Sequence, residues 1–439
     1  MKKSIFVLKI LIFTVLFLIL TIPVAFLLKD DTKSYSRALF HEFYEQKNID
    51  YLICGASHVS HGLEANVASQ KLGKNVFNTG TSQQQIDGTL AIINQTLKLY
   101  KPEKIFLELD FAITCGKSFS SRTGFSSEYI VASGIKDFSI KSDYLLHCSK
   151  PKYYPNAFLP IGKDKMLTLN PKKIFLKLKS IFSGEYFKYT YSDEKFEYAG
   201  KGCVLDSDEI KDGTFSDYQK ESKIDVKGIS DDWKVTVDKI IDVCKKNGIE
   251  LIFYSMPGSD FYLNQKGNYD EYYSFCRDFF AERGFSYYDF NLARPDILSL
   301  LDSDFVDDNH LSKKGIYKWT DVFCDFFASK YREENSLEKY FYSSYAQKMQ
   351  EMDERIFGLY VIECDDRKSL EIIPVKNHVD SSKITFDVYA LCDGETITLA
   401  EKSTDTIFPL PDGKSGKIRA ISYIDGVKQN DCVENFASF

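Results

Sequence analysis

The feature that most restricts the fold of this chain is an uncharged apolar segment close to its N-terminus. No residue from Ile10 to Leu28 carries a charge. As an α-helix, a segment of this length reaches about 28 Å, which is close to the roughly 30 Å hydrocarbon thickness of a bilayer. The sequence therefore predicts that residues 1–28 form a single transmembrane helix that acts as a signal anchor.

The charges that flank this segment indicate its orientation. Three lysines precede it, whereas Lys29 on the far side is followed at once by Asp30 and Asp31. This lysine asymmetry favours a cytoplasmic N-terminus, so we expect a single-pass protein of the cell membrane with residues after about 29 outside the cytoplasm. A cleaved signal peptide is the alternative, but the stretch from Pro23 to Leu28 offers no small-residue cleavage site.

The composition of the chain and its expected position outside the cytoplasm limit the kinds of reaction it can catalyse. The 56 Lys plus Arg and 63 Asp plus Glu give a net charge of −7, which argues against a nucleic-acid partner. Ten cysteines without a Cys-x-x-Cys pair favour neither a disulfide framework nor a zinc site. No Walker A or dinucleotide-type glycine pattern occurs, and ATP and nicotinamides are not at hand outside the cytoplasm. We therefore expect chemistry by side chains alone, with no cofactor and no metal.

The soluble part reads as an open α/β sheet followed by a smaller β domain. Short apolar segments alternate with helical periods, a pattern typical of parallel strands joined by crossover helices. The predicted strands are Ile49–Cys54, Lys74–Asn78, Lys104–Leu109, Glu250–Tyr254 and Phe285–Asp289. The predicted organisation is a linker at 29–48, an α/β domain at 49–335 with an insertion at 112–225 over one sheet edge, and an antiparallel β-sandwich at 345–439.

One segment of the insertion stands out by composition. Residues from Pro171 to Phe182 alternate basic and large apolar side chains. Such a segment can rest on a lipid surface or on a membrane partner. The more ordinary interpretation is a solvated basic face over a packed apolar stripe.

Residues with catalytic potential follow the predicted strands. In an open parallel sheet, reactive groups gather beyond the carboxyl ends of the strands. Ser57 follows the first strand and Gly80 the second, while Asp307 and His310 precede the last helix. We expect Ser57 to attack an acyl carbonyl, His310 to transfer the proton, and Asp307 to orient the imidazole. The backbone amides of Ser57 and Gly80 are expected to form the oxyanion hole.

These motifs resemble those of the SGNH (GDSL-like) hydrolase superfamily. The matching blocks are Gly55-Ala56-Ser57, Asn78-Thr79-Gly80, and Asp307 to His310 with Leu311 and Gly315 after it, which is the most specific block. The resemblance covers roughly residues 49–333 without the insertion. It implies a flavodoxin-like three-layer fold with a parallel sheet. The N-terminal anchor further resembles members that work beside membrane-bound O-acyltransferases, such as the DltD-like proteins and those that O-acetylate exopolysaccharides.

The sequence departs from this family after the third predicted strand. Where the family often has Gly-x-Asn-Asp, this chain has Glu108-Leu109-Asp110, so the asparagine donor of the oxyanion hole is missing. Either a donor from the Ser82–Gln85 stretch replaces it, or Asp110 faces the substrate or caps a loop. We also expect His58 and Asn78 to contact the substrate. His58 and His61 could form a metal pair, but neither has a Cys or Glu nearby at ligand spacing.

The resemblance and the anchor together predict a function. We expect an extracytoplasmic acyltransferase that moves an acyl group, expected to be acetyl, from an acylated donor onto a cell-surface glycan or polymer. A membrane-bound O-acyltransferase is an expected partner. Three alternatives stay open: an esterase or deacetylase with the same site, D-alanyl transfer to teichoic acid, and a noncatalytic partner that binds a glycan or an acyltransferase.

Overall fold

The computed structural model divides the chain into two compact units. Unit 1 comprises residues 1–60, 65–204 and 228–251, and unit 2 comprises residues 61–64, 205–227 and 252–439. The structure describes residues 2–436 except 33, 117, 118, 120, 121, 123, 126, 163, 164, 193, 194, 209–222, 329–336, 366, 367 and 412. Part of the predicted insertion, 209–222, therefore lies outside the described residues.

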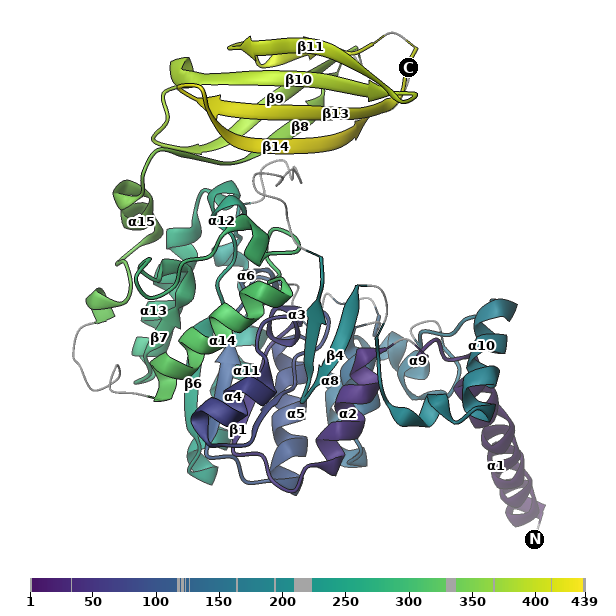
Figure 1. Ribbon diagram of the computed structural model, residues 1–439. Coiled ribbons are helices and arrows are strands. Elements are labelled where there is room, and N and C mark those ends of the chain that lie inside the picture. The colour runs from purple at the N-terminus through teal and green to yellow at the C-terminus, as the bar shows by residue number, and fades with distance from the viewer. Residues whose placement is uncertain are drawn as a thin grey trace. The chain divides into compact units, whose positions relative to one another are not determined.

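The N-terminal apolar segment is one continuous helix. Helix α1 runs over Lys2–Leu28 (Figure 1). Its segment Ile5–Leu28 is long and apolar enough to cross a bilayer, and none of its most apolar stretch is buried within the protein. The prediction of a membrane-spanning helix is therefore confirmed as far as length and composition determine it.

A five-stranded sheet has the order β2-β1-β3-β6-β7, in which the paired strands are parallel. The strands are β1 (Tyr51–Cys54), β2 (Val76–Asn78), β3 (Lys104–Glu108), β6 (Glu250–Ser255) and β7 (Tyr287–Asp289). Ile53 of β1 is in register with Asn78 on one side and Phe106 on the other. Consecutive residues such as Leu52 and Ile53 are all buried, so helices cover both faces of the sheet. All five predicted strands are confirmed within three residues at each end.

Besides α1, the helices of unit 1 are mostly short. They are α2 (Tyr35–Glu45), α3 (Ser57–Ser60), α4 (Ala65–Leu72), α5 (Ile86–Leu99), α6 (Phe111–Thr114), α7 (Glu128–Gly134), α8 (Phe138–His147), α9 (Tyr154–Phe158), α10 (Pro171–Phe182) and α11 (Asp231–Asn247). The insertion also contributes a hairpin of β4 (Phe196–Gly200) and β5 (Cys203–Asp206). The backbone amide of Asn78, in edge strand β2, donates to the carbonyl of Lys201 in this hairpin at 3.0 Å. The hairpin of the insertion thus lies at the sheet edge, as predicted.

The predicted linker at 29–48 is wrong. Most of it is helix α2, whose Leu39 and Phe43 side chains are buried. The ring of Phe43 contacts those of Phe77 and Tyr100 edge-on. The segment is therefore part of the core of unit 1, because burying these large apolar side chains stabilises the packed helix.

Unit 2 contains the remaining helices and an antiparallel domain. The helices are α12 (Asp260–Lys266), α13 (Tyr269–Ala281), α14 (Lys313–Ala328) and α15 (Tyr345–Glu351). The strands are β8 (Arg355–Glu363), β9 (Ser369–Asn377), β10 (Ile384–Cys392), β11 (Glu395–Ser403), β12 (Ile407–Pro409), β13 (Gly416–Ile424) and β14 (Val427–Phe436).

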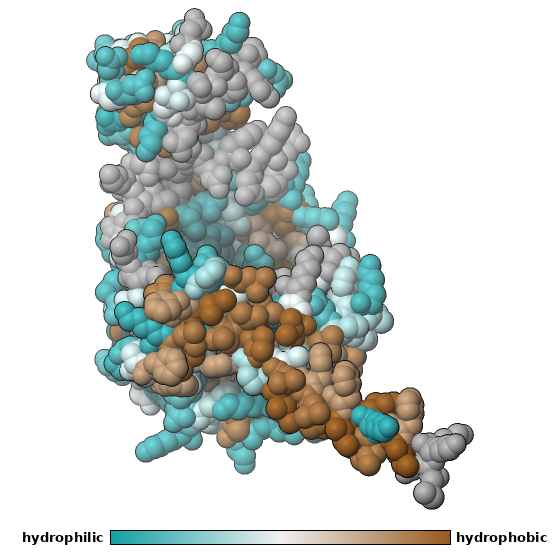
Figure 2. Space-filling view, turned by 90° about the vertical axis from the view of Figure 1, so that its right-hand side faces the viewer, coloured by the Kyte–Doolittle hydropathy of each residue, from teal (hydrophilic) through white to brown (hydrophobic). Residues whose placement is uncertain are grey.

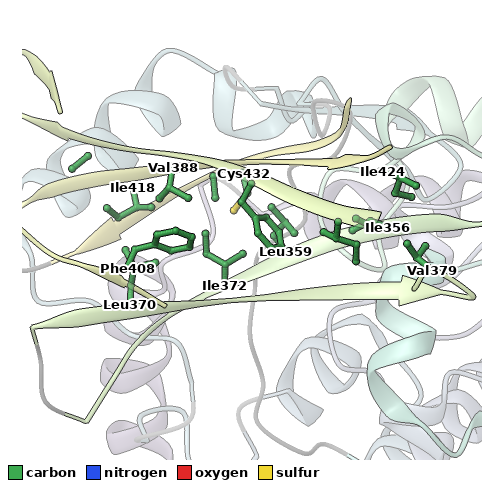
Figure 3. Packing of buried hydrophobic residues seen from close by; sticks show 14 of the residues in the cluster. Ile356, Leu359, Leu370, Ile372, Val379, Val388, Phe408, Ile418, Ile424 and Cys432 are labelled. Carbon is green, nitrogen blue, oxygen red and sulfur yellow. The ribbon is translucent and has the colours of Figure 1, made fainter. Parts of the chain in front are cut away.

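These seven C-terminal strands form two sheets, with the orders β11-β10-β13-β14 and β12-β9-β8. Alternate residues of the strands face a common core, which includes Leu359, Ile372, Val388 and Phe408 (Figure 3). The predicted β-sandwich is confirmed.

Candidate functional site

Ser57 lies directly beyond the carboxyl end of β1. The strand ends at Cys54, and α3 begins at Ser57 after a two-residue turn. The carbonyl of Ala56 accepts hydrogen bonds from the amides of Val59 and Ser60 at 3.2 and 3.4 Å, which closes the first helical turn. Ser57 is partly exposed, whereas Ala56 and His58 on either side are buried. The predicted nucleophile therefore lies at the turn between a strand and a helix, just beyond the carboxyl end of β1.

Asn78, the last residue of β2, links helix α3 to the turn that follows β2. Its side chain is completely buried, with 0 % exposure. The Nδ2 atom donates to the carbonyl of Val59 at 2.6 Å, and Oδ1 accepts from the amide of Gly80 at 2.9 Å. Both polar ends of the Asn78 side chain are thus engaged inside the protein, and its predicted contact with a substrate stays a prediction.

Gly80 packs directly against α3. A Cβ atom at this position would lie 2.6 Å from the carbonyl oxygen of Ala56 and 2.9 Å from the amide of Ser60. Only glycine permits this close approach of the two backbones. Its own amide, however, donates to Asn78, so the predicted oxyanion role of Gly80 requires the Asn78 side chain to turn away.

A cluster of one histidine and two carboxylates lies at the carboxyl end of β3. Nδ1 of His58 is 3.6 Å from Oε1 of Glu108 and 3.9 Å from Oδ2 of Asp110, and all three side chains are at most one-tenth exposed. The other carboxylate oxygen of Asp110 accepts the amide of Ala112 at 2.9 Å and caps α6. Of the alternatives for Asp110, the capping role is confirmed, while its contact with a substrate stays a prediction.

A small cavity opens beside this cluster. Its lining includes Gly55, Glu108, Asp110 and Trp233. The volume is about 20 Å³, and a cavity of roughly 10–15 Å³ already holds one water molecule. An acyl chain would therefore need side chains to move before it could enter here. The predicted contact of His58 with a substrate stays a prediction.

Asp307 and His310 form a hydrogen-bonded pair within unit 2. Nδ1 of His310 is 2.8 Å from Oδ2 of Asp307. The other oxygen, Oδ1, accepts the backbone amides of Asn309 and His310 at 3.0 and 2.7 Å. Burial raises the pKa of Asp307, but the hydrogen bond and charge of His310 and the two amides outweigh burial and leave this pKa below its ordinary value. The pair is thus an ionised carboxylate that fixes an imidazole, leaving Nε2 as the ring nitrogen for proton exchange.

The loop that carries this pair is closed at its base. Phe305 and Leu311 form a β-bridge, and the amide of Val306 donates to the carbonyl of His310 at 2.9 Å. The carboxylate of buried Asp304 accepts a hydrogen bond of 2.6 Å from the ammonium group of Lys318, a residue of α14. These contacts hold the loop in one conformation, which is what an imidazole of defined orientation requires.

His61 is a neighbour that the sequence patterns did not identify. Its ring lies edge-on to that of His310, with 5.7 Å between the ring centroids. His61 follows Ser57 by four residues in the sequence. In the sequence, His61 was notable only for its three-residue spacing from His58, which suggested a metal pair and not a contact with His310. Among the residues that the structure describes, no group of three or more His, Cys, Asp or Glu side chains is arranged to hold a metal ion.

The predicted site residues fall into two groups. Ser57, His58, Asn78, Gly80 and Asp110 belong to unit 1, whereas Asp307 and His310 belong to unit 2. The approach of Ser57 to His310 therefore stays a prediction. The chain matches no known protein-family model and no curated protein.

Proposed function

We propose that this protein is a membrane-anchored, extracytoplasmic acyltransferase of the SGNH type. It transfers an acyl group, in the simplest case acetyl, to a cell-surface glycan or polymer through an ester on Ser57. The single observation that carries the proposal is the Asp307–His310 pair, whose imidazole is in ring contact with His61, four residues after Ser57. A carboxylate-bound imidazole of this kind is the base that a serine nucleophile needs.

The strand order gives the proposal a second support. Numbered along the sheet's own strands, β2-β1-β3-β6-β7 is 2-1-3-4-5, the doubly wound order of flavodoxin-like folds. In such sheets ligands bind beyond the carboxyl ends of the strands where the order reverses, between β1 and β3. Ser57 follows β1, and the cluster of His58, Glu108 and Asp110 lies at the end of β3.

The reaction follows from these residues. As the Ser57 hydroxyl attacks the acyl carbonyl, Nε2 of His310 takes its proton, and Asp307 stabilises the resulting imidazolium. His310 then returns the proton to the leaving group of the donor. An acceptor hydroxyl repeats the sequence on the Ser57 ester, which releases the acylated product and restores the serine.

The oxyanion hole in this proposal uses the two backbone amides that the sequence suggested, but one of them, the amide of Gly80, already donates to Asn78. The amide of Ser57 is one donor, and the amide of Gly80 becomes a second when Asn78 turns away from it. The carboxylates of Glu108 and Asp110 would repel an oxyanion nearby. Losing one oxyanion donor costs about 10²- to 10³-fold in rate, so without the asparagine donor we expect slow formation and slow breakdown of the Ser57 ester.

The anchor favours transfer over free hydrolysis. A helix that spans the membrane with its N-terminus in the cytoplasm keeps unit 1 beside a membrane-bound acyl donor and a polymer at the cell surface. Such tethering raises the effective concentration of both without any new contact. A membrane-bound O-acyltransferase that supplies the acyl group fits this arrangement.

A serine-directed phosphonate probe tests the chemistry directly. We expect the purified full-length protein to be labelled at Ser57 and the label to be lost in Ser57→Ala. His310→Ala should slow labelling by about 10³-fold or more, whereas Ser133→Ala, at an exposed serine on α7, should label like the wild type. Equal labelling of wild type and Ser57→Ala would refute the proposal.

A noncatalytic glycan-binding protein is the second candidate, and the two carboxylates beside His58 favour it. If binding is the function, Ser57→Ala and His310→Ala should leave the acylation of surface polymers in cells unchanged. Loss of acylation in both variants, with normal amounts of protein in the membrane, would instead support the acyltransferase.

A further inference from the structure

Helix α10 of the insertion is fixed to the end of the membrane helix. Lys177 of α10 is only 1 % exposed, and its ammonium donates to the carbonyls of Phe26 and Lys29 at 2.6 and 2.8 Å. It also pairs with Oδ1 of Asp31 at 2.7 Å. The last carbonyls of a helix lack partners within the helix, so this lysine caps the C-terminal end of α1.

A second set of contacts holds the chain that leads into α10. The amide of Asp30 donates to the carbonyl of Met166, and the amide of Thr168 donates to the carbonyl of Leu28, both at 2.8 Å. At the start of α10, Lys173 pairs with Asp30 at 2.6 Å. Helix α10 therefore lies beside the C-terminal end of α1 in space, although the two are far apart in the sequence (Figure 1).

The outward face of α10 is apolar and basic. Phe175, Leu176 and Phe182 are 66, 59 and 86 % exposed. Lys172 and Lys179 are exposed as well, and the spacings of three and four residues place these side chains on one face of the helix. Leu169, just before the helix, is 81 % exposed. A helix packed on a soluble protein would turn such residues inward.

The apolar surface of this face continues that of α1. Figure 2 looks onto the side of the protein that carries these helices, and hydrophobic surface extends from α1 onto the adjoining part of unit 1. The side chains of α1 must lie in lipid if it spans the bilayer. Any surface that adjoins the exit point of α1 then meets the headgroup region of the same leaflet.

We propose that α10 lies in the membrane interface, with Phe175, Leu176 and Phe182 inserted at the boundary between headgroups and acyl chains of the leaflet that α1 leaves at Leu28. Aromatic and basic side chains together suit this region, because the rings bury in the acyl boundary while the ammonium groups reach the headgroup phosphates. The pair of helices then fixes how unit 1 is oriented on the membrane, which a single flexible tether cannot do. The proposal rests on α1 spanning the bilayer and is independent of the serine chemistry.

Tryptophan fluorescence in vesicles tests the proposal with the full-length protein. Both native tryptophans, Trp233 and Trp319, are buried, so they give a constant background. The test variants are Phe175→Trp and Phe182→Trp. The protein is reconstituted into phosphatidylcholine vesicles that contain phosphatidylglycerol, with lipids brominated at shallow or deep acyl positions.

We expect the emission of both test variants to shift to the blue and to be quenched most by shallow bromines. Phe17→Trp, within α1, should be quenched most by deep bromines. If Phe17→Trp responds as expected but both α10 variants emit as in water, the face is not in lipid and the proposal is overturned. If Phe17→Trp is not quenched, α1 does not span the bilayer and the proposal falls with it.

Discussion

Replacing Gly315 by alanine should destabilise the loop that carries Asp307 and His310. Gly315 lies in the first turn of α14 and is buried. A Cβ atom there would lie 2.9 Å from the carbonyl carbon of Asp304 and 3.1 Å from its Cβ, and nearer still to the carbonyl oxygen. These atoms are not the mobile end of a side chain, so α14 and the base of the loop must move apart.

The size of the effect follows from competing contributions. In an open helix, alanine in place of glycine stabilises by up to about 1 kcal/mol. Forcing an extra methyl group into a packed region costs about 1–3 kcal/mol. The displaced carbonyl of Asp304 also accepts the amide of Ser312 at 2.8 Å, and a lost hydrogen bond of this kind costs about 1 kcal/mol. We therefore expect a net loss of about 1–3 kcal/mol.

Urea unfolding of the full-length protein in detergent measures this loss. Trp319 lies on the same helix and is completely buried, so its fluorescence reports on the unfolding of this region. Lys313→Ala is the matched control, because Lys313 is an exposed residue in the same turn, and its effect should stay within about 0.5 kcal/mol. If Gly315→Ala is as stable as the wild type or more stable, the close contact with Asp304 is absent and the reasoning fails.

Three further substitutions test other parts of the structure. Burial raises the pKa of Asp289 from 3.8 to about 6, although hydrogen bonds from Tyr269 and Asn291 lower it, so the folded state holds this proton more tightly than the unfolded state. The stability that this group contributes is complete below pH 3.8 and is lost as the pH rises to about 6. The loss amounts to about 3 kcal/mol at most. When the free energy of unfolding is measured against pH, Asp289→Asn should lack this component. Lys177→Met removes the ammonium from buried carbonyls and a carboxylate, which should cost about 3–5 kcal/mol; limited proteolysis that cuts α10 no faster than in the wild type would contradict this. Gly80→Ala forces α3 away from β2 and should slow phosphonate labelling of the serine by about 10²-fold, and unchanged labelling would show that the contact does not position the nucleophile.

Local patterns in the sequence determined much of the fold. The membrane helix follows from a run of uncharged apolar residues, and the five parallel strands follow from short apolar segments between helical periods. The β-sandwich follows from strands in which apolar and polar residues alternate, so that every second side chain faces the common core. The Asp307–His310 pair also belongs here, because three residues in a tight loop suffice to bring the two side chains together. Each of these features depends on neighbours in the chain.

Partners from distant parts of the chain decided the rest. The sequence suggested a linker where helix α2 lies, because the burial of Phe43 depends on contacts with Phe77 and Tyr100, which are distant in the sequence. The sequence suggested a substrate contact for Asn78, yet the tertiary structure buries it beneath α3.

The same limit applies to the charged groups. Lys177 caps a carbonyl 151 residues earlier in the chain, and His58 meets a carboxylate from another strand end. Basic and apolar alternation in the segment around Lys177 was compatible with a soluble face, because the sequence does not show which side of a helix is covered. Burial and pairing of polar groups depend on which surfaces the folded chain brings together, and only the tertiary structure determines this.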